Sequence, residues 1–135
     1  MKKTIFLLFT ALFSTILLWA QPSKGKYIEV LYFKANLACC KAKACNAIEA
    51  DIQSFVAKNF PKGNVTFTEI KLIEESNKAI IEKYDAQSQT VILVKHNKKK
   101  DVSINVSDLV KKYMQDKNKE DLEKTFVLKI NEFLK

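Results

Sequence analysis

Residues 27–45 read YIEVLYFKANLACCKAKAC, and this stretch decides the fold. The first seven residues, 27–33, are mostly β-branched, aromatic or aliphatic, which predicts a buried strand. Residues 34–44 show no strong period, and a helical pattern begins at Cys45. We therefore predict that all three cysteines lie where the first strand feeds the first helix.

The helix that follows is predicted from its apolar spacing. Its apolar residues fall on one face and its polar residues on the other, and Pro61 with Gly63 ends it. The apolar face consists of Ile48, Ile52, Phe55, Val56 and Phe60.

The rest of the chain alternates strands and helices. A second strand is predicted over 65–70, and a short helix over about 76–84 with Ser76 as its N-cap. The apolar run 90–94 is typical of a strand buried on both faces. The remaining expected elements are a hairpin turn at 96–100, a strand around 102–104, a helix over about 107–114, and a last helix capped by Asn118 with Leu122, Phe126, Ile130 and Leu134 on one stripe.

The resulting order is β-α-β-α-β-β-α, with the C-terminal helix split in two. Right-handed crossovers leave very few topologies for this order. We predict an α/β protein with a thioredoxin-like fold, a central mixed four-stranded sheet and an extra C-terminal helix. In that fold a redox or metal-binding cysteine pair sits between the first strand and the first helix.

The first twenty residues are expected to be a signal peptide. Lys2 and Lys3 precede an apolar run over 5–19, and a polar segment follows Ala20. The apolar run is shorter than the roughly 20 residues that a membrane-spanning helix needs. We therefore expect a signal peptide (1–20), a short linker (21–26) and one thioredoxin-like domain (27–135), in a periplasmic or secreted protein with no stable membrane insertion after cleavage.

Composition narrows the class of partner. The chain has 135 residues and a formal charge of +8, and every basic residue except the single histidine is a lysine. Specific nucleic-acid recognition usually recruits arginine, and no nucleic-acid motif is present. The lysine run 98–100 predicts at most a weak attraction to anionic membranes, and we expect a monomer with no nucleic-acid partner.

The candidate site is the trio Cys39, Cys40 and Cys45. If Cys45 begins the helix, the unpaired N–H groups there favour a thiolate. Lysines at 34, 41 and 43 surround the trio, and no acidic residue occurs between 29 and 49. The sequence therefore predicts reactive thiols.

Three interpretations of the trio remain open. Three thiolates suit a thiophilic ion such as trivalent arsenic, trivalent antimony or monovalent copper, and no cofactor is otherwise required. Alternatively, Cys39 or Cys40 attacks a partner protein's disulfide and Cys45 resolves the intermediate, or the reverse, which would make the chain a thiol–disulfide oxidoreductase. A structural disulfide in a non-catalytic interaction module is the third interpretation. The only histidine, His96, is expected to be a surface or capping residue.

From Tyr27 onward the chain resembles the exported thioredoxin-like ArsF family, or nitrophenyl compound nitroreductase subunit. The resemblance rests on residues 30–33, 45–49 and 91–95. Members of that family usually carry Cys-x-x-Cys, which implies Cys39 and Cys45 as the pair, with three residues inserted and Cys40 as an extra thiol.

The Cys-Cys-x4-Cys spacing is similar to that of the ArsD arsenic metallochaperones. That resemblance implies Cys39, Cys40 and Cys45 as ligands of trivalent arsenic. Thioredoxin relatives also place a cis-proline before the third strand, where this chain has residues 88–91, Ser-Gln-Thr-Val. A trans bond is therefore expected at Thr90, because a non-proline cis bond costs about 3–4 kcal/mol.

Overall fold

The computed structural model describes residues 26–36 and 40–135, and only the backbone of residues 40–42. The expected signal peptide, most of the expected linker and Cys39 lie outside the described residues. Within them, no helix combines the length and the apolar character needed to cross a membrane.

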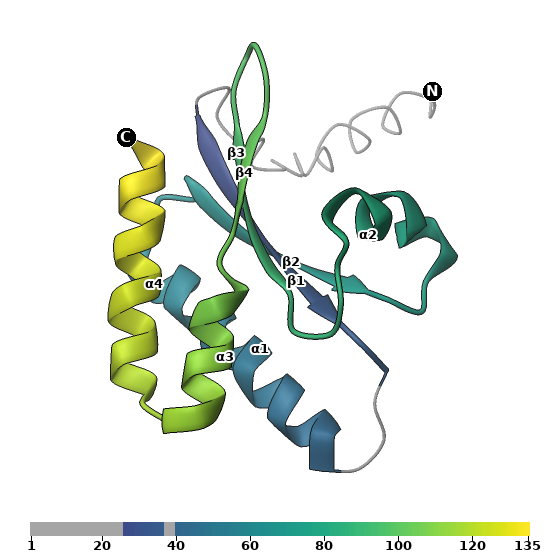
Figure 1. Ribbon diagram of the computed structural model, residues 1–135. Coiled ribbons are helices and arrows are strands. Elements are labelled where there is room, and N and C mark those ends of the chain that lie inside the picture. The colour runs from purple at the N-terminus through teal and green to yellow at the C-terminus, as the bar shows by residue number, and fades with distance from the viewer. Residues whose placement is uncertain (1–25, 37–39) are drawn as a thin grey trace, which may run out of the picture.

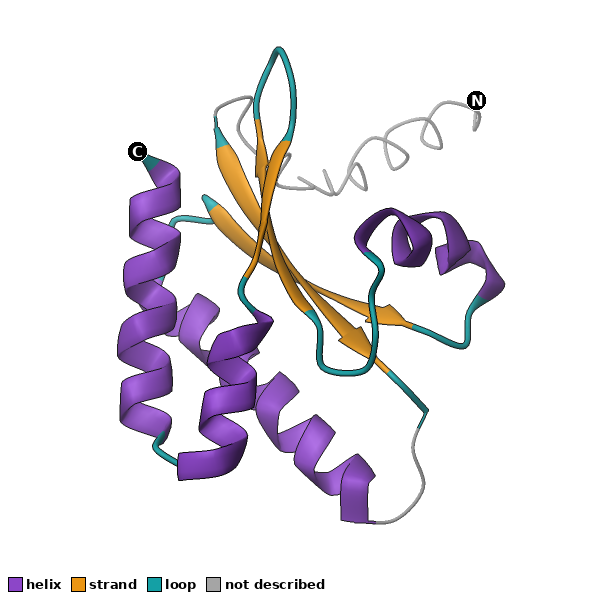
Figure 2. Cartoon of the chain, viewed as in Figure 1, coloured by secondary structure: helices purple, strands orange, loops and turns teal. Residues whose placement is uncertain are grey.

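The described chain forms four strands and four α-helices, which Figure 2 colours by type. The strands are β1 (Tyr27–Lys34), β2 (Val65–Lys71), β3 (Val91–His96) and β4 (Val102–Asn105). The helices are α1 (Cys40–Asn59), α2 (Lys78–Tyr84), α3 (Ser107–Asp116) and α4 (Lys119–Leu134), with the 3-10 turn η1 (Glu75–Asn77) before α2.

The strands form one mixed sheet in the order β2-β1-β3-β4. β1 pairs in parallel with β2 and antiparallel with β3, so that Val30 lies between Phe67 and Leu93. β4 pairs antiparallel with β3 at the edge. This order, with helices on both faces, confirms the predicted thioredoxin-like α/β fold and its extra C-terminal helix, α4.

Helices cover both faces of the sheet because β1 and β3 are apolar on both sides. Figure 1 shows α1, α3 and α4 on one face and α2 on the other. Alternate residues of β1 therefore enter two different clusters. Tyr32 packs in the larger cluster with Ile52 and Phe126, whereas Phe33 packs in the smaller one with residues of α2.

Two helix starts differ from the prediction. α1 begins at Cys40, five residues before the predicted start at Cys45. Ser76 lies inside η1 and does not cap a helix, since α2 begins at Lys78 after Asn77. The predicted cap of the last helix is confirmed, because the side chain of Asn118 accepts a hydrogen bond from the backbone of Asp121.

Candidate functional site

The structure places Cys40 and Cys45 in the same helix. Cys40 is the first residue of α1, and Cys45 lies in the second turn. The prediction that Cys45 occupies the helix N-terminus is therefore wrong. The residues between the two cysteines are only lysine and alanine, which are strong helix formers. The helix therefore begins before its apolar pattern does.

Cys45 is fixed at its backbone and buried at its side chain. It is a free thiol with 2% of its surface exposed. The hydroxyl of Tyr32, on β1, donates a hydrogen bond to the carbonyl oxygen of Cys45 at 3.1 Å. Burial, and then the nearby Cys45, raise the pKa of Tyr32, so the phenol keeps its proton and remains a donor.

The Cys45 thiol contacts the loop that leads into β3. Gln89 Nε2 donates to Cys45 Sγ at 3.2 Å, and Ser88 Oγ lies 3.9 Å from the same sulfur. Backbone bonds fix the loop to β1: Gln89 N donates to Phe33 O at 2.8 Å, and Phe33 N donates to Thr90 O at 2.9 Å. The fold thus brings residues 88 and 89 against the thiol although they are more than forty positions away.

This loop occupies the place where thioredoxin relatives carry a cis-proline. No described peptide bond is cis, so the predicted trans bond at Thr90 is confirmed. Gln89 instead has φ 68°, in the left-handed region that residues other than glycine rarely adopt. The side chain that covers Cys45 therefore comes from a backbone conformation with a cost of about 1–3 kcal/mol.

Lys34 does not contribute the free positive charge predicted for the cysteine trio. Its Nζ lies 2.5 Å from Glu49 Oε2 and 3.4 Å from Glu69 Oε2. The hydrogen bond to Glu49 raises the pKa of Lys34. Burial, and then a hydrogen bond with Glu69, raise the pKa of Glu49. The hydrogen bond with Glu49, and then the hydrogen bond with Lys34, lower the pKa of Glu69.

Glu49 and Glu69 thus both engage Lys34 in a partly buried cluster. Glu49 lies one helical turn beyond Cys45 on α1, which puts acidic groups on the side of the site that the sequence predicted to be basic. Lys43 is exposed, and the side chain of Lys41 lies outside the described residues.

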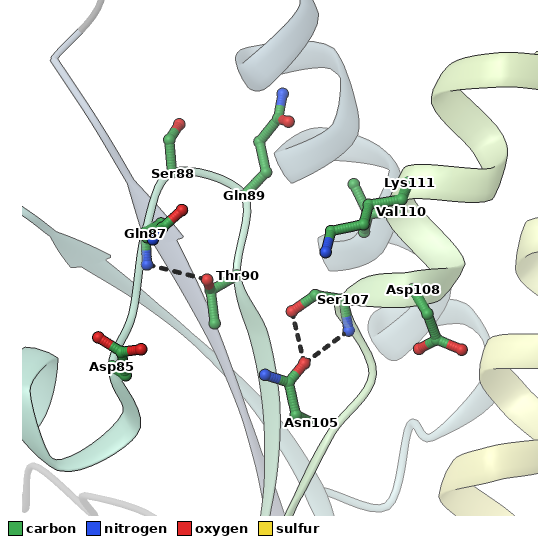
Figure 3. A pocket seen from close by; sticks show the side chains of 10 residues that line it. All are labelled: Asp85, Gln87, Ser88, Gln89, Thr90, Asn105, Ser107, Asp108, Val110 and Lys111. Carbon is green, nitrogen blue, oxygen red and sulfur yellow. Dashed lines mark hydrogen bonds between the residues drawn. The ribbon is translucent and has the colours of Figure 1, made fainter.

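A polar hollow of about 500 Å³ opens beside the Gln89 loop (Figure 3). The loop forms one wall, and the start of α3 forms the other. Asn105 Oδ1 accepts hydrogen bonds from the backbone and the hydroxyl of Ser107, which holds the second wall in place. Since Ser88 and Gln89 both line the hollow and contact Cys45 Sγ, they separate the buried thiol from this open space.

His96 lies at the far end of β3 and has its own partners. Nε2 is 3.1 Å from Glu29 Oε2, and Nδ1 is 3.0 Å from Asp101 Oδ2. These contacts agree with the predicted surface role.

Within 26–36 and 40–135, no group of three or more His, Cys, Asp or Glu residues is placed to hold a metal ion. The thiols of Cys39 and Cys40 lie outside the described part of the chain, so the trio stays a prediction.

Helical geometry sets the distance between Cys40 and Cys45. Five residues of a regular helix advance about 7.5 Å and turn through about 140°, which separates the two Cα atoms by about 8.7 Å. A disulfide requires a Cα separation of at most about 7 Å. A bridge between Cys40 and Cys45 would therefore require the first turns of α1 to unwind.

The contacts of Gln89 predict that it controls access to Cys45. In a background where Cys39 and Cys40 are serine, Gln89→Gly is expected to raise the rate of Cys45 alkylation by iodoacetamide about tenfold or more. Glycine accepts the left-handed backbone without cost and removes the cover over the sulfur. Gln87→Gly is the matched control, because Gln87 lines the same hollow and has no described contact with the thiol. Equal rates for the two variants would contradict this role.

Sequence reasoning did not assign a role to Tyr32, Glu69 or Gln89. The apolar pattern placed Tyr32 in a strand but said nothing of its hydroxyl. For Gln89 a signal existed, since the missing proline before the third strand marked residues 88–91 as unusual. Nothing in the local sequence shows that the Gln89 amide reaches Cys45.

Comparisons with known proteins place the chain in no family. No protein-family model matches it, and no curated protein matches it. A solved structure described as that of a malarial protein is similar, with 21% identity over 62% of this chain and 90% of that chain, at a TM-score of 0.40. A likeness at this level supports no conclusion about fold or function.

Proposed function

We propose that the chain is an exported thiol protein that captures a thiophilic ion through the thiolates of Cys39, Cys40 and Cys45. The ion is trivalent arsenic, trivalent antimony or monovalent copper, all of which accept three sulfur ligands. The observation that carries the proposal is the placement of Cys40 and Cys45 in one helix, five residues apart.

That spacing favours a bridging ion over a direct sulfur–sulfur bond. In a disulfide the sulfurs are about 2.05 Å apart. Around a metal centre with bonds near 2.3 Å, two sulfurs lie roughly 3.4–3.8 Å apart, which adds about 1.5 Å of reach. The tolerated Cα separation then rises to about 8.5 Å, against 8.7 Å and a turn of about 140° in a regular helix, so an ion requires a smaller adjustment of the first turns of α1 than a disulfide does. Cys39 directly precedes Cys40 and supplies the third thiol.

Capture of arsenite is a ligand exchange without oxidation or reduction. Three arsenic–oxygen bonds of arsenous acid break and three arsenic–sulfur bonds form. Each thiol proton leaves with one hydroxyl group as water, so arsenic stays trivalent. Cys45 is buried and Gln89 covers its sulfur, so capture requires the Gln89 side chain to move aside before the third bond forms.

Thiol–disulfide exchange with a partner protein is the second candidate. The position of Cys40 at the first residue of α1 favours it, because a helix N-terminus stabilises a thiolate. Cys40 would attack the partner's disulfide, and Cys45 would resolve the mixed disulfide only after α1 unwinds. A structural disulfide in an interaction module faces the same obstacle if it joins Cys40 to Cys45.

Circular dichroism combined with thiol counting separates these candidates. Arsenite added to the reduced protein is expected to remove three titratable thiols and to lower the helical signal less than a disulfide does, because the ion spans more of the spacing within α1. Oxidation to a Cys40–Cys45 disulfide is expected to lower the helical signal. Thiols that stay titratable in excess arsenite would contradict capture, and a disulfide that forms and reduces readily would then support exchange.

A further inference from the structure

Exposed lysines gather at one end of the molecule. Lys98, Lys99 and Lys100 lie in the turn between β3 and β4, and Lys26 directly precedes β1. The sheet brings these segments together, because Tyr27 pairs with His96 and their rings stack at 4.5 Å. We call these four residues the basic tip: Lys26, Lys98, Lys99 and Lys100.

The four lysines of the basic tip outnumber the acids beside them and form no ion pair with any described carboxylate. Within the described part of the chain, no carboxylate lies within ion-pair distance of its lysines, whereas many other lysines are paired with an acid, as Lys119 is with Asp51. Two acids, Glu29 and Asp101, lie near the four lysines, and both face His96. Glu29 contacts His96 and accepts a hydrogen bond from Thr68 at 2.7 Å, and Asp101 contacts the other nitrogen of His96.

The basic tip lies at one end of the sheet, away from the start of α1. Figure 1 shows the β3–β4 turn projecting beyond the sheet at the end where β1 begins and α4 ends. β1 runs from this end toward α1 and Cys40, and its eight residues span about 26 Å. The basic tip and the helix start that carries Cys40 and Cys45 therefore lie at opposite ends of the sheet.

We propose that the basic tip docks on an anionic phospholipid surface and holds the cysteine end away from it. The expected signal peptide, 1–20, brings the chain to a membrane for export and ends six residues before Lys26. The basic tip thus lies at the end of the folded chain that is nearest the expected cleavage site. The proposal is independent of the thiol function, because it uses none of the cysteines.

The expected strength follows from the number of lysines. Each lysine near an anionic surface strengthens binding about fivefold, so three of them contribute roughly a hundredfold. Attraction of this kind falls with added salt, because the charges act over about a Debye length.

Vesicle flotation tests the proposal on the protein purified from a bacterial host that has exported it. Vesicles of phosphatidylcholine alone are compared with vesicles that also contain phosphatidylglycerol. The test variant carries Lys98→Gln, Lys99→Gln and Lys100→Gln. Its control carries Lys83→Gln, Lys111→Gln and Lys124→Gln, which removes the same charge from exposed positions outside the basic tip.

The native protein is expected to bind the anionic vesicles selectively. The tip variant is expected to lose roughly a hundredfold in partition coefficient, while the control keeps its binding within about threefold. Lys26→Gln alone is expected to cost about fivefold. An equal loss in both triple variants, absence of binding by the native protein, or binding to soluble poly-glutamate without binding to vesicles would each overturn the proposal.

Discussion

Replacing Cys45 with serine is expected to weaken arsenite binding by roughly 10²–10⁴-fold. Each thiolate that is already bound raises the effective concentration of the next, and this advantage is lost when one of three ligands is removed. Serine is close to cysteine in size, so the fold around Tyr32 and Gln89 should persist. Isothermal titration calorimetry of the reduced protein, with circular dichroism as the test of folding, measures the effect.

The matched control for this prediction is Ser88→Ala. Ser88 lies 3.9 Å from Cys45 Sγ but supplies no thiolate, so its loss should change arsenite affinity by less than about threefold. Cys39→Ser and Cys40→Ser should each weaken binding as strongly as the change at Cys45. Retention of tight binding in any one of the three cysteine variants would show that fewer than three thiols hold the ion.

Replacing Phe126 with alanine is expected to lower the free energy of unfolding by about 3–5 kcal/mol. Phe126 lies on α4 with 2% of its surface exposed, in the same cluster as Tyr32 and Ile52. Truncation removes apolar contacts and leaves a cavity between α4, the sheet and α1, which the surrounding helices cannot fully close. Urea unfolding followed by circular dichroism measures the change.

Leu128→Ala is the control for this prediction. Leu128 lies two residues further along α4 and is 51% exposed, so its truncation should change the free energy of unfolding by less than about 0.5 kcal/mol. Equal effects at Phe126 and Leu128 would mean that α4 does not belong to the core. A large effect at Phe126 and a small one at Leu128 would show that α4 packs in the core of the domain that carries the cysteines.

The fold was predictable from the sequence because its apolar patterns are strong. The run Val91–Val94 predicted a strand buried on both faces, and all four residues are buried in β3. The stripe of Leu122, Phe126, Ile130 and Leu134 predicted the inward face of α4; the first three are its buried residues, and Leu134, at the end of the helix, is partly buried. Such patterns identify elements reliably because burial requires apolar side chains at the period of the element.

The details of the candidate site depend on tertiary contacts that leave no local pattern. The sequence places Lys34 next to the cysteines, but its neutralisation by Glu69 depends on the pairing of β1 with β2. The contact of Gln89 with Cys45 depends in the same way on the pairing of β1 with β3. The start of α1 was missed for another reason, since lysine and alanine give a helix without an apolar period.

Native mass spectrometry of the reduced protein with arsenite tests the central proposal most directly. Capture predicts an adduct of one arsenic atom less three protons, absent from each single Cys→Ser variant. A protein that gains no arsenic, and that instead loses two hydrogens on isolation without reductant through a readily reversible bridge, would contradict capture and establish exchange as the function of the cysteines.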